Sequence, residues 1–194
     1  MAELERSGVH KSYPEIETSR LRLRQFCEQD CETFVPIYGD AAGMQFMGKG
    51  AKSPAETAQS IKWKMLHWDQ RGYGLWCVVE KSTGAVIGHC GLAWLDFLEE
   101  VEVAYLIDRS RWGRGYATEA VLASIAYGFE VIKPERIIAI IRPGNETSAK
   151  VATKCGMSFY KNTTHQGFDF NCYQVEYRTY LMNCGETPST YLKI

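Results

Sequence analysis

Two glycines, Gly113 and Gly115, lie in the short turn that carries the clearest chemical signal in the chain. The turn follows an apolar, β-rich run, 101–107, and precedes a run, 116–130, in which apolar residues recur at helical spacing. Three arginines accompany the glycines: Arg109, Arg111 and Arg114. Backbone N–H groups at a helix N-terminus point outward together and carry about half a positive charge. Glycines let this backbone approach phosphate oxygens and arginines add positive charge, so the segment predicts a pyrophosphate site.

The spacing of this turn separates it from two other phosphate-binding patterns. It lacks the Gly-Lys-Ser/Thr ending of a P-loop, and no third glycine or alanine follows Gly113 and Gly115 at the spacing of a dinucleotide-binding fingerprint. A plain strand-to-helix turn, with glycines for geometry and arginines in water, would show the same residues. On these residues alone, both interpretations stay open.

The elements that must position the turn follow from hydrophobic periodicity and turn residues. Strands are predicted at 20–25, 75–80, 85–92, 100–107, 136–141, 159–160 and 171–181, and helices at 28–39, 54–70, 116–130 and 145–155. Ser53-Pro54 with Glu56 predicts a capped helix start, and Lys81–Gly84 predicts a hairpin turn. The middle strands then form an antiparallel meander, and the helix before the strand at 136–141 predicts a βαβ crossover. This order indicates an α+β or mixed-sheet plan.

Composition argues against several classes of protein. The 22 Lys and Arg against 23 Asp and Glu give a formal charge of -1, without the basic excess that nucleic-acid binding requires. No apolar stretch approaches the roughly 20 residues of a membrane span, and the N-terminus lacks a signal-like apolar run, so we expect no membrane partner and a cytoplasmic location. Seven cysteines without a CxxC pair predict neither a disulfide framework nor a zinc site, although Cys27 and Cys31 could share a helix face as a metal pair.

Three segments resemble one family. Trp112-Gly113-Arg114-Gly115-Tyr116-Ala117 is similar to the acetyl-CoA motif of the GNAT superfamily of N-acetyltransferases, with Trp112 at a position that is Gln or Arg in the family. Asn145-Glu146-Thr147-Ser148 resembles the family's Asn-x-x-Ser helix, and the Lys-x-Gly that follows ends in Met157 instead of Phe. With the opening Thr18–Arg24, these motifs resemble the ribosomal-protein alanine N-acetyltransferases over about residues 20–182.

The resemblance implies a fold and a cosubstrate. The fold is a mixed, mostly antiparallel central sheet flanked by helices, in which the strand before the turn splays from the next strand and leaves a wedge for the pantetheine arm. The cosubstrate is acetyl-CoA, and no metal is implied. The positions that would bind it are Tyr105, Leu106, Ile107, Trp112, Gly113, Arg114, Gly115, Tyr116, Ala117 and Asn145.

Two residues are the candidate catalytic groups. Attack on a thioester requires a neutral amine, so a base must remove a proton near pH 7. Glu102 lies where related enzymes often have a carboxylate that acts through water, and the alternative is that Glu99, Glu100 and Glu102 form a solvated acidic edge. Ser148 could hydrogen-bond the leaving sulfur, and the alternative for Ser148 and Asn145 is helix capping.

The expected activity is transfer of an acetyl group from acetyl-CoA to a primary amine, which is a protein N-terminus or a small molecule. The alternative is a non-catalytic acyl-CoA sensor with the same fold. We expect an arm at 1–17, one domain at 18–182 and a tail at 183–194, with a homodimer possible. Specificity in such enzymes comes from the early helices and the late-strand loop, here about 29–72 and 161–170.

Overall fold

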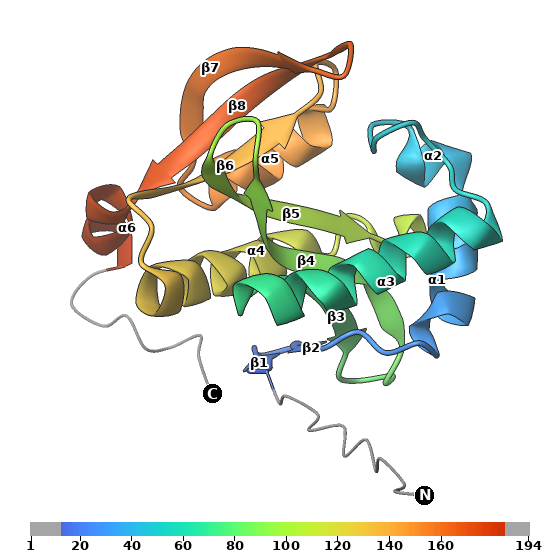
Figure 1. Ribbon diagram of the computed structural model, residues 1–194. Helices are drawn as coiled ribbons and strands as arrows, with labels where there is room; N and C mark the ends of the chain where they lie inside the picture. Colours follow the sequence, from blue (N-terminus) through green and yellow to red (C-terminus); the bar gives the residue numbers. More distant parts are fainter. Residues whose placement is uncertain (1–12, 185–194) are drawn as a thin grey trace, which may run out of the picture.

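Strand-forming runs spread along the chain pair into one sheet. The computed structural model describes residues 13–184, and within this range eight strands lie in the order β1-β2-β3-β4-β5-β6-β8-β7 (Figure 1). The strands are β1 (Ile16–Glu17), β2 (Leu21–Arg24), β3 (Leu75–Glu80), β4 (Val86–Leu95), β5 (Glu100–Ile107), β6 (Arg136–Ile141), β7 (Ser158–His165) and β8 (Phe168–Glu176). All neighbours are antiparallel except β5 and β6, which are parallel. The predicted mixed, mostly antiparallel sheet flanked by helices is therefore confirmed.

Helices occupy the connections. They are α1 (Asp30–Gly39), α2 (Ala41–Met44), α3 (Pro54–Arg71), α4 (Tyr116–Tyr127), α5 (Glu146–Lys154) and α6 (Tyr177–Cys184), with a 3-10 turn η1 (Arg109–Arg111) and a π-helical turn η2 (Gly128–Ile132). The predicted start of α3 is confirmed, because Ser53 and Glu56 form a reciprocal capping box. None of the helices in the described range is long and apolar enough to cross a membrane.

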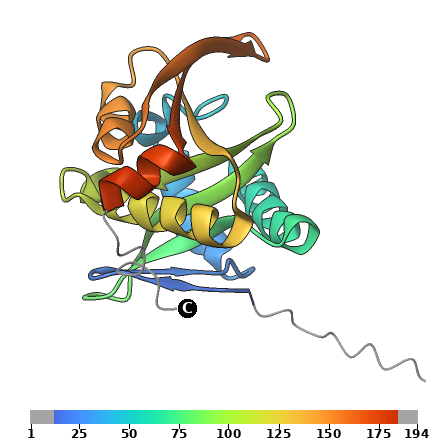
Figure 2. The ribbon, with the colours of Figure 1, turned by 90° about the vertical axis from the view of Figure 1, so that its left-hand side faces the viewer.

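Side chains along β5 alternate between the two faces of the sheet, and each face packs against different helices. Val101, Val103 and Ile107 pack in a cluster with residues of α4, whereas Leu106 and the partly buried Ala104 pack in a second cluster with residues of α1. Figure 2 shows α4 in front of the sheet in that view, with α1 behind it. A residue on β5 therefore faces one helix layer or the other according to its parity.

The parallel neighbours β5 and β6 pair at one point only. β4 follows β5 along its whole length, from Leu95 opposite Glu100 to Gly88 opposite Ile107. In contrast, β6 pairs with β5 only where Ile138 lies opposite Glu102. The expected splay of these two strands is confirmed, and it opens beyond Glu102 toward the turn that starts α4.

Three segments differ from the sequence-based expectations. The run at 171–181 is not one strand, because β8 ends at Glu176 and α6 begins at Tyr177. Tyr177 and Tyr180, three residues apart, both pack on Phe129, and this tertiary contact favours a helix over continued alternation. The predicted loop at 161–170 is mostly the hairpin of β7 and β8, and the predicted helix at 116–130 is α4 followed by η2.

The strand β1 and the short helix α2 were not predicted. β1 lies in the expected arm, where Ile16 is fully buried and pairs with Leu23 of β2. Most of that arm, residues 1–12, and most of the expected tail, residues 185–194, lie outside the described residues. The domain limits at 18 and 182 stay predictions.

Candidate active site

A cavity of about 370 Å³ lies where the C-terminal end of β5 meets the N-terminal ends of α4 and α5. Ten predicted site residues line it: Tyr105, Leu106, Ile107, Trp112, Gly113, Gly115, Tyr116, Ala117, Asn145 and Ser148. These residues come from a strand, a turn and two helices, so only the fold brings them together. Two predicted site residues, Arg114 and Glu102, are not part of the lining.

The glycine turn adopts backbone angles that favour glycine. Gly113 has φ of 75° and Gly115 has φ of 79°, both in the left-handed region. A Cβ built at Gly113 would meet nothing within 4 Å, and one at Gly115 would lie 3.5 Å from Arg20 Nη2, so the space beside both glycines is open. Gly115 is also the N-cap of α4. The turn therefore offers open backbone at a helix N-terminus, which is the geometry that binds phosphates.

Positive charge surrounds this turn. Arg111 lines the cavity from η1, and Lys150 and Lys154 line it from α5. The two lysines were not among the predicted site residues. Their spacing of four residues on a predicted helix places both on one face, and this signal could have identified them.

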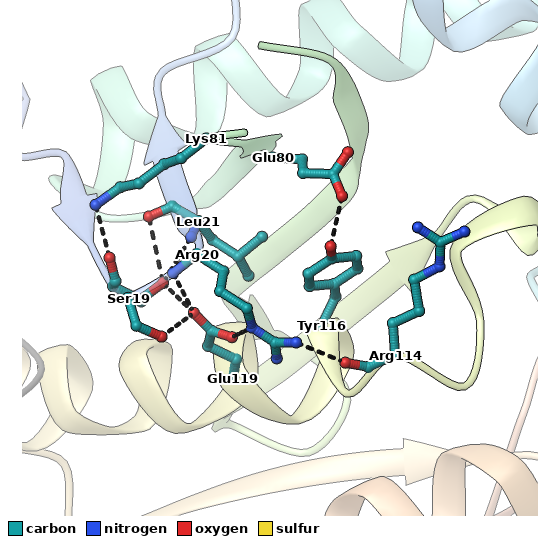
Figure 3. A network of polar contacts seen from close by, with 9 residues as sticks. Ser19, Arg20, Leu21, Glu80, Lys81, Arg114, Tyr116 and Glu119 are labelled. Carbon is teal, nitrogen blue, oxygen red and sulfur yellow. Dashed lines mark hydrogen bonds and ion pairs between the residues drawn. The ribbon is translucent and has the colours of Figure 1, made fainter. Parts of the chain in front are cut away.

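Arg114 contacts the start of β2, and its role toward a ligand stays a prediction. Its backbone oxygen accepts a hydrogen bond from Arg20 Nη1 at 2.8 Å (Figure 3), and Arg114 is not part of the cavity lining. Trp112 does line the cavity, and its indole Nε1 donates to the Ile107 oxygen at 2.7 Å. That bond fixes the turn against the end of β5.

Glu102 lies on β5 opposite Ile138, at the last point where β5 and β6 pair. By parity it shares the α1 face with Ala104 and Leu106, whereas Tyr105 faces α5 and donates its hydroxyl to the Ser148 oxygen at 2.8 Å. Burial raises the pKa of Glu102 to about 7, and a hydrogen bond from the Ile140 backbone opposes this rise. A pKa near neutral pH suits a general base.

The start of α5 shows capping at the residues predicted for binding. Asn145 Oδ1 accepts a hydrogen bond from the Ser148 backbone N–H at 3.2 Å, so Asn145 is the N-cap of α5. Both residues also line the cavity. The alternative of helix capping therefore holds for Asn145, and the capped start of α5 places Asn145 and Ser148 at the cavity wall. Their roles toward a ligand stay predictions.

The short helix α2 and the residues after it form one wall of the cavity. Gln45, Phe46 and Met47 line it. The N-cap of α2, Asp40, accepts a hydrogen bond from Arg109 Nε at 2.6 Å, and that ion pair lowers the pKa of Asp40. This wall is thereby joined to the segment that leads into the glycine turn. Within residues 13–184, no group of three or more His, Cys, Asp or Glu side chains is placed to hold a metal ion.

The sequence matches a family profile described as an acetyltransferase (GNAT) domain over residues 20–158. The chain is also 34% identical over 149 residues to the protein YkkB of Bacillus subtilis strain 168, a match that covers 74% of this chain and 85% of YkkB.

Two solved structures share the fold. One is RimL, a ribosomal L7/L12 alpha-N-protein acetyltransferase in complex with coenzyme A, with a TM-score of 0.70, 19% identity and coverage of 84% of this chain and 98% of RimL. The other is the ribosomal-protein-S5-alanine acetyltransferase of Vibrio fischeri, with a TM-score of 0.68, 19% identity and coverage of 84% of this chain and 96% of that chain.

Proposed function

The chain belongs to the GNAT acetyltransferase family, and from this premise we propose that it transfers the acetyl group of acetyl-CoA to a primary amine within a ternary complex. The single observation that best supports this is the cavity, which joins an open glycine turn, three cationic side chains and the splayed end of β5 in one continuous lining. An anionic, elongated thioester fits such a site, because the turn can bind its pyrophosphate and the gap between β5 and β6 can hold its arm.

The turn and its cations would hold the pyrophosphate of acetyl-CoA. Gly113 and Gly115 expose backbone N–H groups, and Arg111, Lys150 and Lys154 supply the counter charge. The arm would then run toward β5, where backbone groups on the side of β6 have no strand partner beyond Glu102. Because buried backbone groups need hydrogen-bond partners, the amides of the arm would supply them.

Glu102 would act as the base that deprotonates the amine. The amine would approach from the α1 face, which Glu102 shares, while the thioester arrives from the cavity through the splay. The Glu102 carboxylate would accept the proton from the ammonium group, directly or through one water, and the freed lone pair would attack the acetyl carbon. Ser148, at the wall of the cavity, would hydrogen-bond the CoA sulfur as the carbon–sulfur bond breaks. The second proton on the attacking nitrogen would pass to the leaving thiolate, so the products are the amide and the free thiol of CoA.

The identity of the amine is the finer part of the proposal. RimL acts on a protein N-terminus according to its name, and this chain shares its fold. A protein N-terminus is therefore the first acceptor to test, beside small-molecule amines. Six cysteines in the described range carry free thiols, which fits the reducing cytoplasm that we propose as its location.

The test has two steps on one sample. Calorimetric titration with acetyl-CoA measures binding, and a thiol-release assay with a panel of amines and N-terminal peptides measures transfer. Binding with release of CoA on one class of acceptor is the expected result. Binding without release on any acceptor would favour a non-catalytic acyl-CoA sensor, and absence of binding would contradict both.

A further inference from the structure

Two buried carboxylates lie behind the glycine turn, outside the lining of the cavity. Glu80 is the last residue of β3, with 4% of its side chain exposed, and Glu119 lies in the first turn of α4, with 11% exposed. Burying a carboxylate is unfavourable unless it is paired and hydrogen-bonded. The partners of these two residues therefore indicate what the carboxylates stabilise.

Glu80 holds both ends of the turn. Its Oε1 accepts a hydrogen bond from the Tyr116 hydroxyl at 2.5 Å, and its Oε2 pairs with Arg111 Nη1 at 2.9 Å. Thr83 Oγ1 adds a third hydrogen bond at 2.7 Å. Arg111 precedes the segment 112–115 and Tyr116 follows it, and both line the cavity. The Glu80 carboxylate thus fixes the distance between Arg111 and Tyr116, the residues on either side of the segment 112–115.

Glu119 ties the same turn to the start of β2, as Figure 3 shows. Its Oε1 accepts hydrogen bonds from Thr18 Oγ1 at 2.6 Å, Ser19 Oγ at 3.1 Å and the Arg20 backbone at 2.9 Å. Its Oε2 accepts one from Arg20 Nε at 2.6 Å. Arg20 in turn donates through Nη1 to the Arg114 oxygen at 2.8 Å and lies 4.7 Å over the Tyr116 ring.

These contacts have one result in common. The segment 112–115 contains two glycines, which can adopt many backbone conformations. Binding of a pyrophosphate requires the conformation in which the backbone N–H groups converge, and a displacement of about 1 Å is enough to weaken such a site. Glu80 fixes the segment through Arg111 and Tyr116, and Glu119 fixes it through Arg20.

We propose that Glu80 and Glu119 are positioning residues that hold the turn 112–115 in its pyrophosphate-binding conformation, without contacting acetyl-CoA themselves. This proposal rests on the proposed function, since it takes acetyl-CoA as the ligand. It also gives a role to Thr18, Ser19 and Arg20, which the sequence marks only by family resemblance.

The test compares two acetyl donors in the variants Glu80→Gln and Glu119→Gln, which keep the size of the side chain and remove its charge. Acetyl-CoA carries the pyrophosphate, and S-acetylpantetheine carries the same thioester arm without it. We expect the Kd for acetyl-CoA to rise roughly tenfold or more, because each variant frees the turn. The KM and kcat with S-acetylpantetheine should stay within about twofold of the wild type.

Asp30→Asn is the matched control. Asp30 is as buried as Glu80, with 4% of its side chain exposed, and it pairs with Arg24 at 2.7 Å, away from the turn. The Tm of every variant is measured beside its affinity. If Asp30→Asn loses as much acetyl-CoA affinity for the same loss of Tm, or if the Glu variants weaken both donors alike, the role is only structural and the proposal is overturned.

Tyr116→Phe keeps the proposal testable if a Glu variant does not fold. It removes only the hydroxyl that reaches Glu80, so by itself it should weaken binding of acetyl-CoA and leave S-acetylpantetheine unaffected. Where Glu80→Gln does fold, Tyr116→Phe should add little to it in the double variant. Unchanged acetyl-CoA affinity in the variants would overturn the positioning role alone. A wild-type chain that does not bind acetyl-CoA would instead overturn the proposed function, and the positioning role with it.

Discussion

Two side chains, the partly buried Glu102 and the buried Lys64, titrate close to neutral pH for the same physical reason. Burial disfavours the charged form, so it raises the pKa of Glu102 to about 7 and lowers the pKa of Lys64 to about 7. Glu102 lies at the splay of the sheet, where a base is useful. Lys64 lies on α3, and its Nζ donates to Ser60 Oγ at 2.8 Å and lies over the rings of Tyr38 and Phe26.

Replacing Glu102 should remove the inflection near pH 7 from the pH dependence of kcat/KM. The carboxylate forms as pH rises through about 7, so kcat/KM of the wild type should rise through that pH and then level off. In Glu102→Gln we expect kcat to fall by roughly 100-fold or more and the inflection to disappear. The Kd for acetyl-CoA should stay nearly constant.

Glu100→Gln is the control for this pH profile. Glu100 lies on the same strand and pairs with Arg136 at 3.1 Å. The inflection near pH 7 should remain in that variant. Equal losses of kcat and acetyl-CoA affinity in Glu102→Gln would make Glu102 structural.

Lys64→Met should stabilise the protein, and the gain should depend on pH. The lowered pKa means that the folded state binds the proton less tightly than the unfolded state does, so the penalty is full below pH 7 and fades as pH rises toward the unfolded pKa. We expect the free energy of unfolding to rise by roughly 2–4 kcal/mol at pH 6, after allowing for the lost cation–π contacts, and by less at pH 9.

Chemical denaturation at the two pH values measures this difference. The exposed neighbour Lys62 gives the control Lys62→Met, which should change stability little at either pH. A Lys64→Met variant that is less stable at pH 6, or equally affected at both pH values, would show that burial does not dominate the energetics of Lys64.

At the scale of elements, the turn between β5 and α4 combines a backbone requirement with a ligand requirement. Gly115 has φ of 79°, and the side chain that a larger residue would carry points into open space near Arg20. A side chain there is therefore tolerated sterically, with a penalty of about 1–2 kcal/mol for the left-handed backbone. Gly115 also lines the cavity in which a pyrophosphate would lie.

Gly115→Glu should therefore abolish binding of acetyl-CoA while the chain still folds. The introduced carboxylate fills the site and repels phosphate oxygens. Gly84→Glu is the control, because Gly84 has φ of 70°, a Cβ there meets nothing within 4 Å, and the residue lies in the hairpin turn between β3 and β4. Calorimetry should show no acetyl-CoA binding for Gly115→Glu and wild-type affinity for Gly84→Glu. Unchanged affinity in Gly115→Glu would contradict the assignment of the turn.

At the scale of the whole molecule, the sheet consists of two halves that meet at one pair of residues. Strands β1 to β5 form one half, β6, β8 and β7 form the other, and between β5 and β6 only Glu102 and Ile138 pair (Figure 1). A ligand in the splay would contact both halves. Its binding energy would then add to the stability of the whole domain.

Acetyl-CoA should accordingly slow hydrogen exchange on both sides of the splay. We expect protection at 103–107 on β5 and at 145–148 at the start of α5, with little change in β2 and β3. The Tm should rise with ligand concentration. At a ligand concentration of 100 times the Kd, the free energy of unfolding should rise by about 2.7 kcal/mol. Protection confined to one half of the sheet would contradict binding in the splay, and the Gly115→Glu variant should show neither effect.

The sequence by itself determined the elements whose signals are local. The capping box at Ser53 and Glu56 predicted α3, and β-rich runs separated by turn residues predicted β3 to β5. The glycine turn was identified from its own residues, and it lies in the lining of the cavity. These signals lie within a few residues of each other, so periodicity and turn chemistry are enough to identify them.

Only the tertiary structure decided what depends on contacts between distant residues. Tyr177 and Tyr180 end β8 and begin α6 because they pack on Phe129, and no local pattern records that contact. Likewise, Glu119 meets Thr18 across 101 positions of sequence. Side-chain periodicity reports only which face of an element is apolar, whereas the partner of a buried charge is chosen when the chain folds, since the charge must be paired once water is excluded.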